Sequence, residues 1–216
     1  MKKLLYFVVL MMLTTLGGIA LTSCLNDDDD NDTIPPITAA EKQARLLLMD
    51  GYYTGHVYFV NDSTQKADSV AIDWVVSARD SAVIINNFPV KILANGISNT
   101  EKHNMLANSE TKVPLISYIY FYNNNSGDND LYTFWNIPKE QKLSFKITDD
   151  QEKEHSVDIK FQEQLNTLGS TGLYASYYAI GDYKKGEMDC FYIINDVIID
   201  NNTYTVNRVI YIWNKY

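Results

Sequence analysis

Apolar and polar residues alternate with a period of two along much of the chain. In one such run, Val157 and Ile159 flank Asp158. This pattern is typical of a β-strand that buries one face against a core and leaves the other in water. Four half-buried antiparallel strands are therefore predicted, at 53–59, 70–76, 143–147 and 157–161.

Other predicted strands carry apolar residues or tyrosines on both faces. Strands of this kind need a helix, a loop or a partner over their second face. Pro89 cannot donate to a ladder and is expected to break the preceding strand. Residues 91–113 are predicted to be a loop region that could include a helical turn. The two-sided segments are 82–86, 115–122, 131–136, 173–180, 189–199 and 203–213.

The segment 39–49 is predicted to be a short helix. Thr38 and Glu41 have the spacing of a capping box, and Gly51 marks the end of the helix. Ala40, Ala44, Leu47 and Leu48 follow a helical period.

One short helix and about nine strands predict an all-β domain over residues 38–216, either an antiparallel β-barrel or a β-sandwich. The sequence Gly51-Tyr52-Tyr53-Thr54-Gly55 resembles the opening of calycin-type barrels, and also openings in uncharacterised lipoprotein families of gut Bacteroidetes. The resemblance implies a calycin-like barrel, whereas the strand pattern alone leaves barrel and sandwich open.

The first 23 residues have the features of a secretory signal peptide. Lys2 and Lys3 precede an apolar stretch that is shorter than a membrane span. The following Leu21-Thr22-Ser23-Cys24 resembles the lipobox of bacterial lipoproteins. The resemblance implies cleavage between Ser23 and Cys24, acylation of Cys24 and anchoring of the chain to a membrane by lipid.

Residues 24–37 are predicted to be an acidic, flexible tether. The run Asp27, Asp28, Asp29 and Asp30 resembles the export signal of Bacteroidetes surface lipoproteins, which implies an outer-membrane protein displayed on the cell surface. The periplasmic leaflet of the outer membrane is the alternative location.

Composition and motifs exclude several functions. The formal charge of −9 argues against nucleic-acid binding, which needs clustered Lys and Arg. His56, His103 and His155 lack a second ligand at zinc spacing, so no metal site is expected. P-loop and dinucleotide fingerprints are absent as well, so no cofactor is expected. His56 and His155 are expected at the wet ends of strands. Cys190 lies in an apolar run and is expected in the core.

Two sets of residues are candidates for sites. Tyr118, Tyr120 and Tyr122 share a strand face and could stack on sugar rings, although tyrosine also simply suits strands. Thr33, Ser69 and Ser81 each follow an aspartate and precede an aliphatic residue, which resembles the O-glycosylation acceptor of Bacteroidetes exported proteins.

No catalytic motif is present in the sequence. The leading hypothesis is a non-enzymatic, lipid-anchored binding or interaction module, with a glycan or a small apolar molecule as ligand. A secreted hydrolase and a structural subunit of an outer-membrane assembly are the alternatives.

Overall fold

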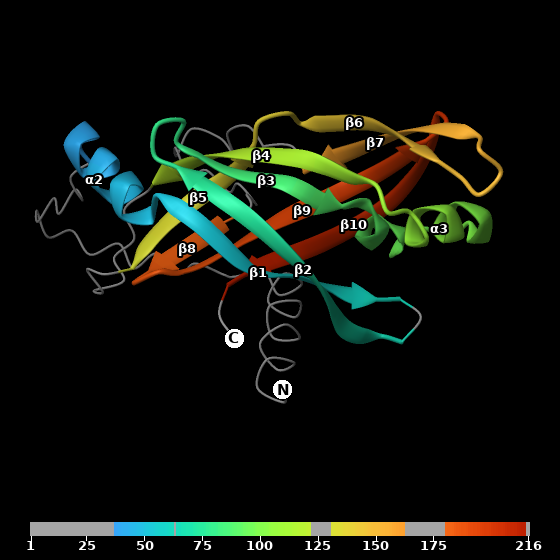
Figure 1. Ribbon diagram of the computed structural model, residues 1–216, viewed down its shortest axis with the longest axis horizontal. Helices are drawn as coiled ribbons and strands as arrows, with labels where there is room; N and C mark the ends of the chain where they lie inside the picture. Colours follow the sequence, from blue (N-terminus) through green and yellow to red (C-terminus); the bar gives the residue numbers. More distant parts are fainter. Residues whose placement is uncertain (1–36, 63, 122–130, 163–179, 215–216) are drawn as a thin grey trace, which may run out of the picture. The chain divides into compact units, whose positions relative to one another are not determined.

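The computed structural model describes residues 37–62, 64–121, 131–162 and 180–214. These residues form ten strands, two short α-helices and one 3-10 helix (Figure 1). In chain order the elements are α2 (Ala39–Met49), β1 (Gly51–Asn61), β2 (Lys66–Ser77), β3 (Ala82–Pro89), η1 (Val90–Ala94), α3 (Thr100–Ala107), β4 (Lys112–Phe121), β5 (Tyr132–Pro138), β6 (Lys142–Thr148), β7 (Glu154–Phe161), β8 (Ile180–Lys184), β9 (Glu187–Ile199) and β10 (Asn202–Trp213).

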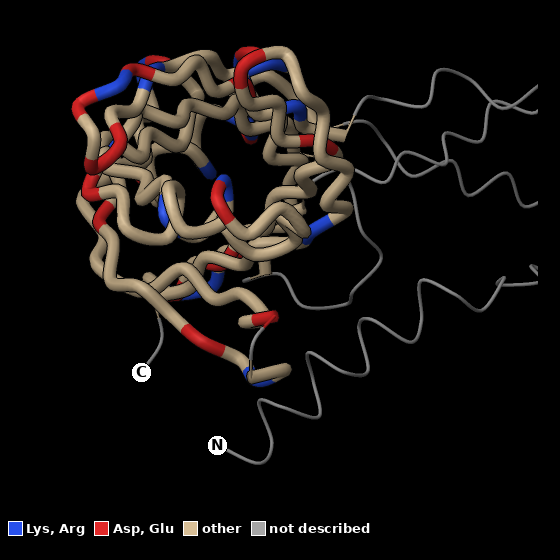
Figure 2. Tube along the Cα trace, turned by 90° about the vertical axis from the view of Figure 1, so that its right-hand side faces the viewer, with Lys and Arg blue, Asp and Glu red and all other residues tan. Residues whose placement is uncertain are grey.

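Eight strands close into an antiparallel barrel, shown end-on in Figure 2. Their order is β10-β1-β2-β3-β4-β5-β8-β9, and β9 pairs again with β10. A sandwich would leave strand edges unpaired, so this closure decides between the two expected architectures. The barrel is consistent with the calycin-like fold that the Gly51–Gly55 segment implied.

The edge of β9 that faces away from β10 is divided between two partners. Its first half pairs with β8, where Cys190 lies opposite Gly181. Its second half pairs with β7, where Ile199 lies opposite Val157. Strand β6 pairs with β7, so the β6–β7 hairpin extends the barrel wall toward the end that carries α3 (Figure 1).

Closure between β1 and β10 depends on a glycine. A Cβ atom at Gly55 would collide with the carbonyl oxygen of Trp213, which packs directly over this position. The second glycine of the Gly51–Gly55 segment is therefore required by the close approach of the last strand to the first.

The predicted alternation is confirmed in the strands that carry it. Val157 and Ile159 are fully buried, whereas Lys160 is exposed. Cys190 is also fully buried, and no disulfide involves it.

Helix α2 has the predicted bounds and capping box but buries a different face. The Thr38 hydroxyl accepts from the Glu41 amide at 3.2 Å, and the Glu41 carboxylate accepts from the Thr38 amide at 2.7 Å. Leu46 and Met49 are buried, whereas Leu47 and Leu48, which carry the helical period, are exposed.

Two tyrosines explain how α2 is oriented. The Tyr53 hydroxyl donates to the Met49 carbonyl at 2.6 Å, and the Tyr183 hydroxyl donates to the Leu48 carbonyl at 2.9 Å. These carbonyls would otherwise lack partners at the helix end. Both bonds tie the last turn of α2 to the barrel and hold Met49 inward.

The expectation of a single helix and a loop over 91–113 is wrong. Helix α3 begins after Asn99, whose side chain accepts from the Lys102 amide, and it buries only Met105 and Leu106. Strand β8 was not predicted over 181–184. Most of the strand expected at 173–180 lies outside the described residues.

Candidate functional site

The outer face of the barrel carries a row of aromatic side chains from neighbouring strands. Because strand side chains alternate, the residues next to inward-facing core positions point outward. We call this set the aromatic belt; its members are Tyr58 on β1, Tyr120 on β4, Trp135 on β5, Phe191 on β9, and Tyr211 and Trp213 on β10. Tyr120 is 50 % exposed, and the other five are half-buried.

Strand register places the belt residues side by side. Tyr211 lies opposite both Tyr58 and Phe191, and Tyr120 lies opposite Trp135. The rings of Tyr211 and Trp213 meet edge to face, with centroids 6.1 Å apart. Aromatic rings fixed by cross-strand neighbours form a surface that loses little conformational entropy when a ligand stacks on it.

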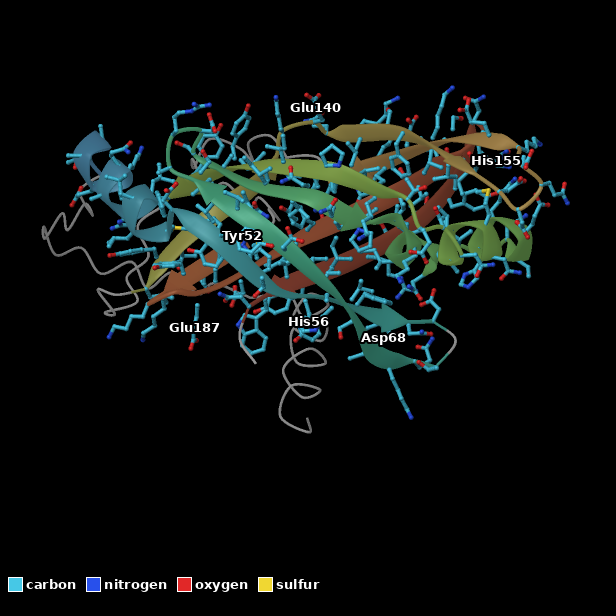
Figure 3. The ribbon with its side chains drawn as sticks, in the orientation of Figure 1. Tyr52, His56, Asp68, Glu140, His155 and Glu187 are labelled. Carbon is cyan, nitrogen blue, oxygen red and sulfur yellow. The ribbon has the colours of Figure 1, made fainter. Side chains whose placement is uncertain are left out.

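Two carboxylates lie directly beside the belt. Asp182 on β8 is the cross-strand partner of Asp189 on β9, and Asp189 is in turn the partner of Trp213. Trp213 in turn lies opposite His56 on β1, which Figure 3 labels on the outer side of that strand, so Asp182, Asp189, Trp213 and His56 form one row across four strands. The row therefore combines apolar rings with hydrogen-bond acceptors on one face.

Burial, aided by the nearby Asp182 carboxylate and opposed by a hydrogen bond from Tyr211, raises the pKa of Asp189 to about 6. Burial also raises the pKa of Tyr211, and the negative charge of Asp189 adds to the effect. One oxygen of Asp182 is buried without a hydrogen-bond partner among the described residues. A carboxyl group with a strongly shifted pKa next to half-buried surface aromatics is a candidate for function.

The predicted tyrosines belong to this region only in part. Tyr118 and Tyr120 share the outer face as expected, and Tyr122 lies outside the described residues. The sequence did not identify Trp135, Tyr211 or Trp213 as their neighbours. The available signal was the apolar content of both faces of strands 131–136, 189–199 and 203–213.

The inner face of the fold is a packed core. The largest fully buried side chains include Trp74, Phe88, Phe134 and Tyr192, and the Tyr53 ring stacks on Trp74 with centroids 5.6 Å apart. Eight strands give an interior that side chains can fill.

Three polar side chains in this core form a hydrogen-bonded group, although Asn136 Nδ2 and Trp74 Nε1 have no partner among the described residues. The Ser117 hydroxyl donates to the side-chain oxygen of Asn136. The Tyr192 hydroxyl, 2.9 Å from Ser117 Oγ, therefore donates to Ser117.

A buried histidine joins three elements at the α3 end of the barrel (Figure 3). His155 Nδ1 lies 2.6 Å from Asp200 in the β9–β10 turn, and Nε2 lies 3.1 Å from Asp149 in the β6–β7 turn. Lys102 of α3 lies 3.8 Å from the same Asp200 oxygen. His155 is only 2 % exposed, so its expected position at a wet strand end is wrong.

Both ring nitrogens of His155 face carboxylates, so both donate when the ring is protonated. Hydrogen bonds to Asp200 and then Asp149 raise the pKa of His155. The same bonds lower the pKa of both aspartates. We call His155, Asp149 and Asp200 the His155 clasp. When the ring is protonated, the clasp is an ionic link between turns that are far apart in sequence.

The remaining predicted sites divide into described and undescribed residues. Ser69 is exposed on β2, and Ser81 is half-buried in the β2–β3 turn with φ +50°. Ser23, Cys24, the run Asp27–Asp30 and Thr33 lie outside the described residues.

Two features are absent from the described ranges. No group of three or more His, Cys, Asp or Glu side chains suited to a metal occurs there. No helix in these ranges is long and apolar enough to cross a bilayer.

The sequence of the barrel matches a known protein family. Residues 48–199 match the family described as Domain of unknown function (DUF4840). The chain belongs to this family. The matched range begins at the end of α2 and runs through β9, so it includes Tyr120, Trp135, Asp182 and Asp189. Neither a curated protein nor a solved structure matches the chain.

Proposed function

We propose that this protein is a non-enzymatic binding module, anchored by lipid on Cys24 to the bacterial outer membrane, which binds saccharides on its aromatic belt. The pairing of the half-exposed Tyr120 with Trp135 is the observation that carries the choice of ligand. Flat rings at the surface can stack on the apolar faces of sugar rings. Asp182 and Asp189 can accept hydrogen bonds from sugar hydroxyls.

The packed interior favours the outer face over an internal ligand. A small apolar molecule inside the barrel would compete for space with Trp74, Phe134 and Tyr192, which are fully buried. Saccharide binding at the surface needs no rearrangement of these side chains.

The proposed location rests on the sequence before α2. Leu21-Thr22-Ser23-Cys24 follows an apolar stretch with two lysines at its start, and Asp27–Asp30 follow the cysteine. Two or three acyl chains on Cys24 would anchor the protein firmly, since each buried CH₂ contributes about 0.8 kcal/mol.

The anchor is tested by Cys24→Ala. The variant should accumulate as an uncut precursor that carries no lipid. A variant with the same mature mass and detergent partitioning as the wild type would refute lipidation at Cys24.

Replacement of Asp27–Asp30 by alanine should keep the lipid but abolish protease accessibility on whole cells, and unchanged accessibility would refute the export role.

Ligand binding is tested with an array of neutral oligosaccharides, followed by calorimetry on the strongest one. Tyr120→Ala should weaken binding about fivefold, equivalent to about 1 kcal/mol for one lost aromatic contact. Val209→Ala removes another exposed apolar side chain on the barrel and should leave binding unchanged. Binding that both substitutions leave unchanged would exclude Tyr120 from the site.

A hydrolase is the second candidate, because Asp182 and Asp189 form a carboxylate pair in which Asp189 has a raised pKa. Glycosidases use one protonated and one ionised carboxyl group in this way. Turnover of the bound oligosaccharide by the wild type, lost in both Asp182→Asn and Asp189→Asn, would favour this candidate. Release of the oligosaccharide unchanged after prolonged incubation would favour the binding module.

A further inference from the structure

Three exposed apolar or aromatic side chains gather where α2 meets β1. Leu47, Leu48 and Tyr52 are 61 %, 59 % and 66 % exposed and lie within six consecutive residues. Only Tyr120 and Val209 are comparable among the described residues. We call the three the leucine–tyrosine patch.

The barrel fixes the patch on the outside. Leu46 and Met49 occupy the inward side of the last turn of α2, and the hydroxyls of Tyr53 and Tyr183 hold that turn by its carbonyls. Leu47 and Leu48 therefore cannot turn inward without breaking these bonds. Neighbouring exposed leucines mark a surface that another apolar phase or molecule covers.

The position of the patch in the chain points to its occupant. Helix α2 is the first described element after the 13 residues Leu25–Ile37, which follow Cys24. Thirteen residues span at most about 45 Å when fully extended. If Cys24 is acylated, as the proposed function states, this tether keeps the patch within reach of the bilayer surface.

The chemistry of α2 also suits a bilayer surface. The helix exposes Lys42, whereas the Arg45 guanidinium lies against the barrel, 5.7 Å and 5.1 Å from the ring centroids of Phe121 and Tyr132. The Glu41 carboxylate is engaged by Thr38 in the capping box. Exposed leucines with a lysine on the same helix and a tyrosine at the polar boundary suit a helix that lies in the headgroup region.

We propose that the leucine–tyrosine patch contacts the membrane in which Cys24 is anchored, so that α2 lies against the headgroups and orients the barrel. This proposal rests on the lipid anchor of the proposed function. It adds a second membrane contact, made by the folded domain itself.

The test uses lipidated full-length protein in phosphatidylcholine vesicles that contain doxyl-labelled lipid. A fluorophore is attached through Leu47→Cys or, as the matched control, Val209→Cys. Cys190 is fully buried and does not compete for the label. The label at position 47 should be quenched several-fold more strongly than the label at position 209.

Three results would overturn the proposal in distinguishable ways. Protein that floats with the vesicles but shows equal quenching at both positions refutes the patch contact and leaves the anchor intact. Protein that does not float with the vesicles refutes the anchor and the patch together. Disulfide-linked dimers of unlabelled Leu47→Cys in vesicles would show that a second copy covers the patch.

Discussion

Replacement of Asp189 by asparagine should stabilise the protein above pH 6. The carboxyl group beside Trp213 is half-buried, and its pKa is raised from 3.8 to about 6. A folded-state pKa above the unfolded value means that the folded state holds the proton more tightly. Asp189 therefore contributes a stability that is present below pH 3.8 and is lost as the pH rises through about 6.

The magnitude follows from the size of the shift. Two pKa units correspond to about 2–3 kcal/mol at 1.36 kcal/mol per unit. Asparagine keeps the shape of the side chain and an oxygen that can accept from Tyr211, but carries no charge. Asp189→Asn should therefore match the wild type near pH 4 and be about 2–3 kcal/mol more stable at pH 8.

Urea unfolding at several pH values, followed by circular dichroism, measures this difference directly. Other titrating groups are shared by both proteins and cancel in the comparison. Asp182→Asn removes the neighbouring charge and should reduce the wild-type loss of stability, whereas Asp150→Asn, at an exposed turn position, should have no effect. Equal stability of Asp189→Asn and wild type at pH 8 would refute the reasoning.

Two further predictions concern the fold. Because the pKa of His155 is raised, the clasp stabilises the protein fully below pH 6.5, and this stability is lost as the pH rises through the folded-state pKa of His155. His155→Gln should abolish this alkaline dependence in the same unfolding assay. An unchanged pH dependence in the variant would contradict the assignment. Ile159→Asp should cost about 4 kcal/mol or more because it buries an unpaired charge, whereas Lys160→Asp should have little effect; equal costs would show that the faces of β7 are wrongly assigned.

The sequence predicted those elements whose conformation is determined by residues close to one another in the chain. The alternation around Val157 and Ile159 predicted both a strand and its buried face, and Thr38 with Glu41 predicted the start of α2. Helix α3 was missed because only Met105 and Leu106 are buried, which leaves too weak an apolar period. Its cap at Asn99 was the one available signal.

Long-range pairing explains the remaining differences. Nothing near Leu47 in the sequence shows that Tyr183, 135 residues from Leu48, donates to the Leu48 carbonyl and helps to orient α2. The burial of His155 depends on Asp200, 45 residues away. The aromatic belt likewise depends on strand pairing, which sets Tyr211 between Tyr58 and Phe191 and Tyr120 opposite Trp135.

The central claim, a saccharide-binding module displayed by a lipid anchor, is tested most directly on whole cells. Cells producing the wild type, Tyr120→Ala or the alanine replacement of Asp27–Asp30 are incubated with a fluorescent form of the strongest oligosaccharide from the array, and bound fluorescence is compared at equal protein levels. The account predicts binding by wild-type cells, about fivefold weaker affinity for Tyr120→Ala, and none for cells that lack the acidic run. Equal binding by all three, or by cells that lack the protein, would contradict it.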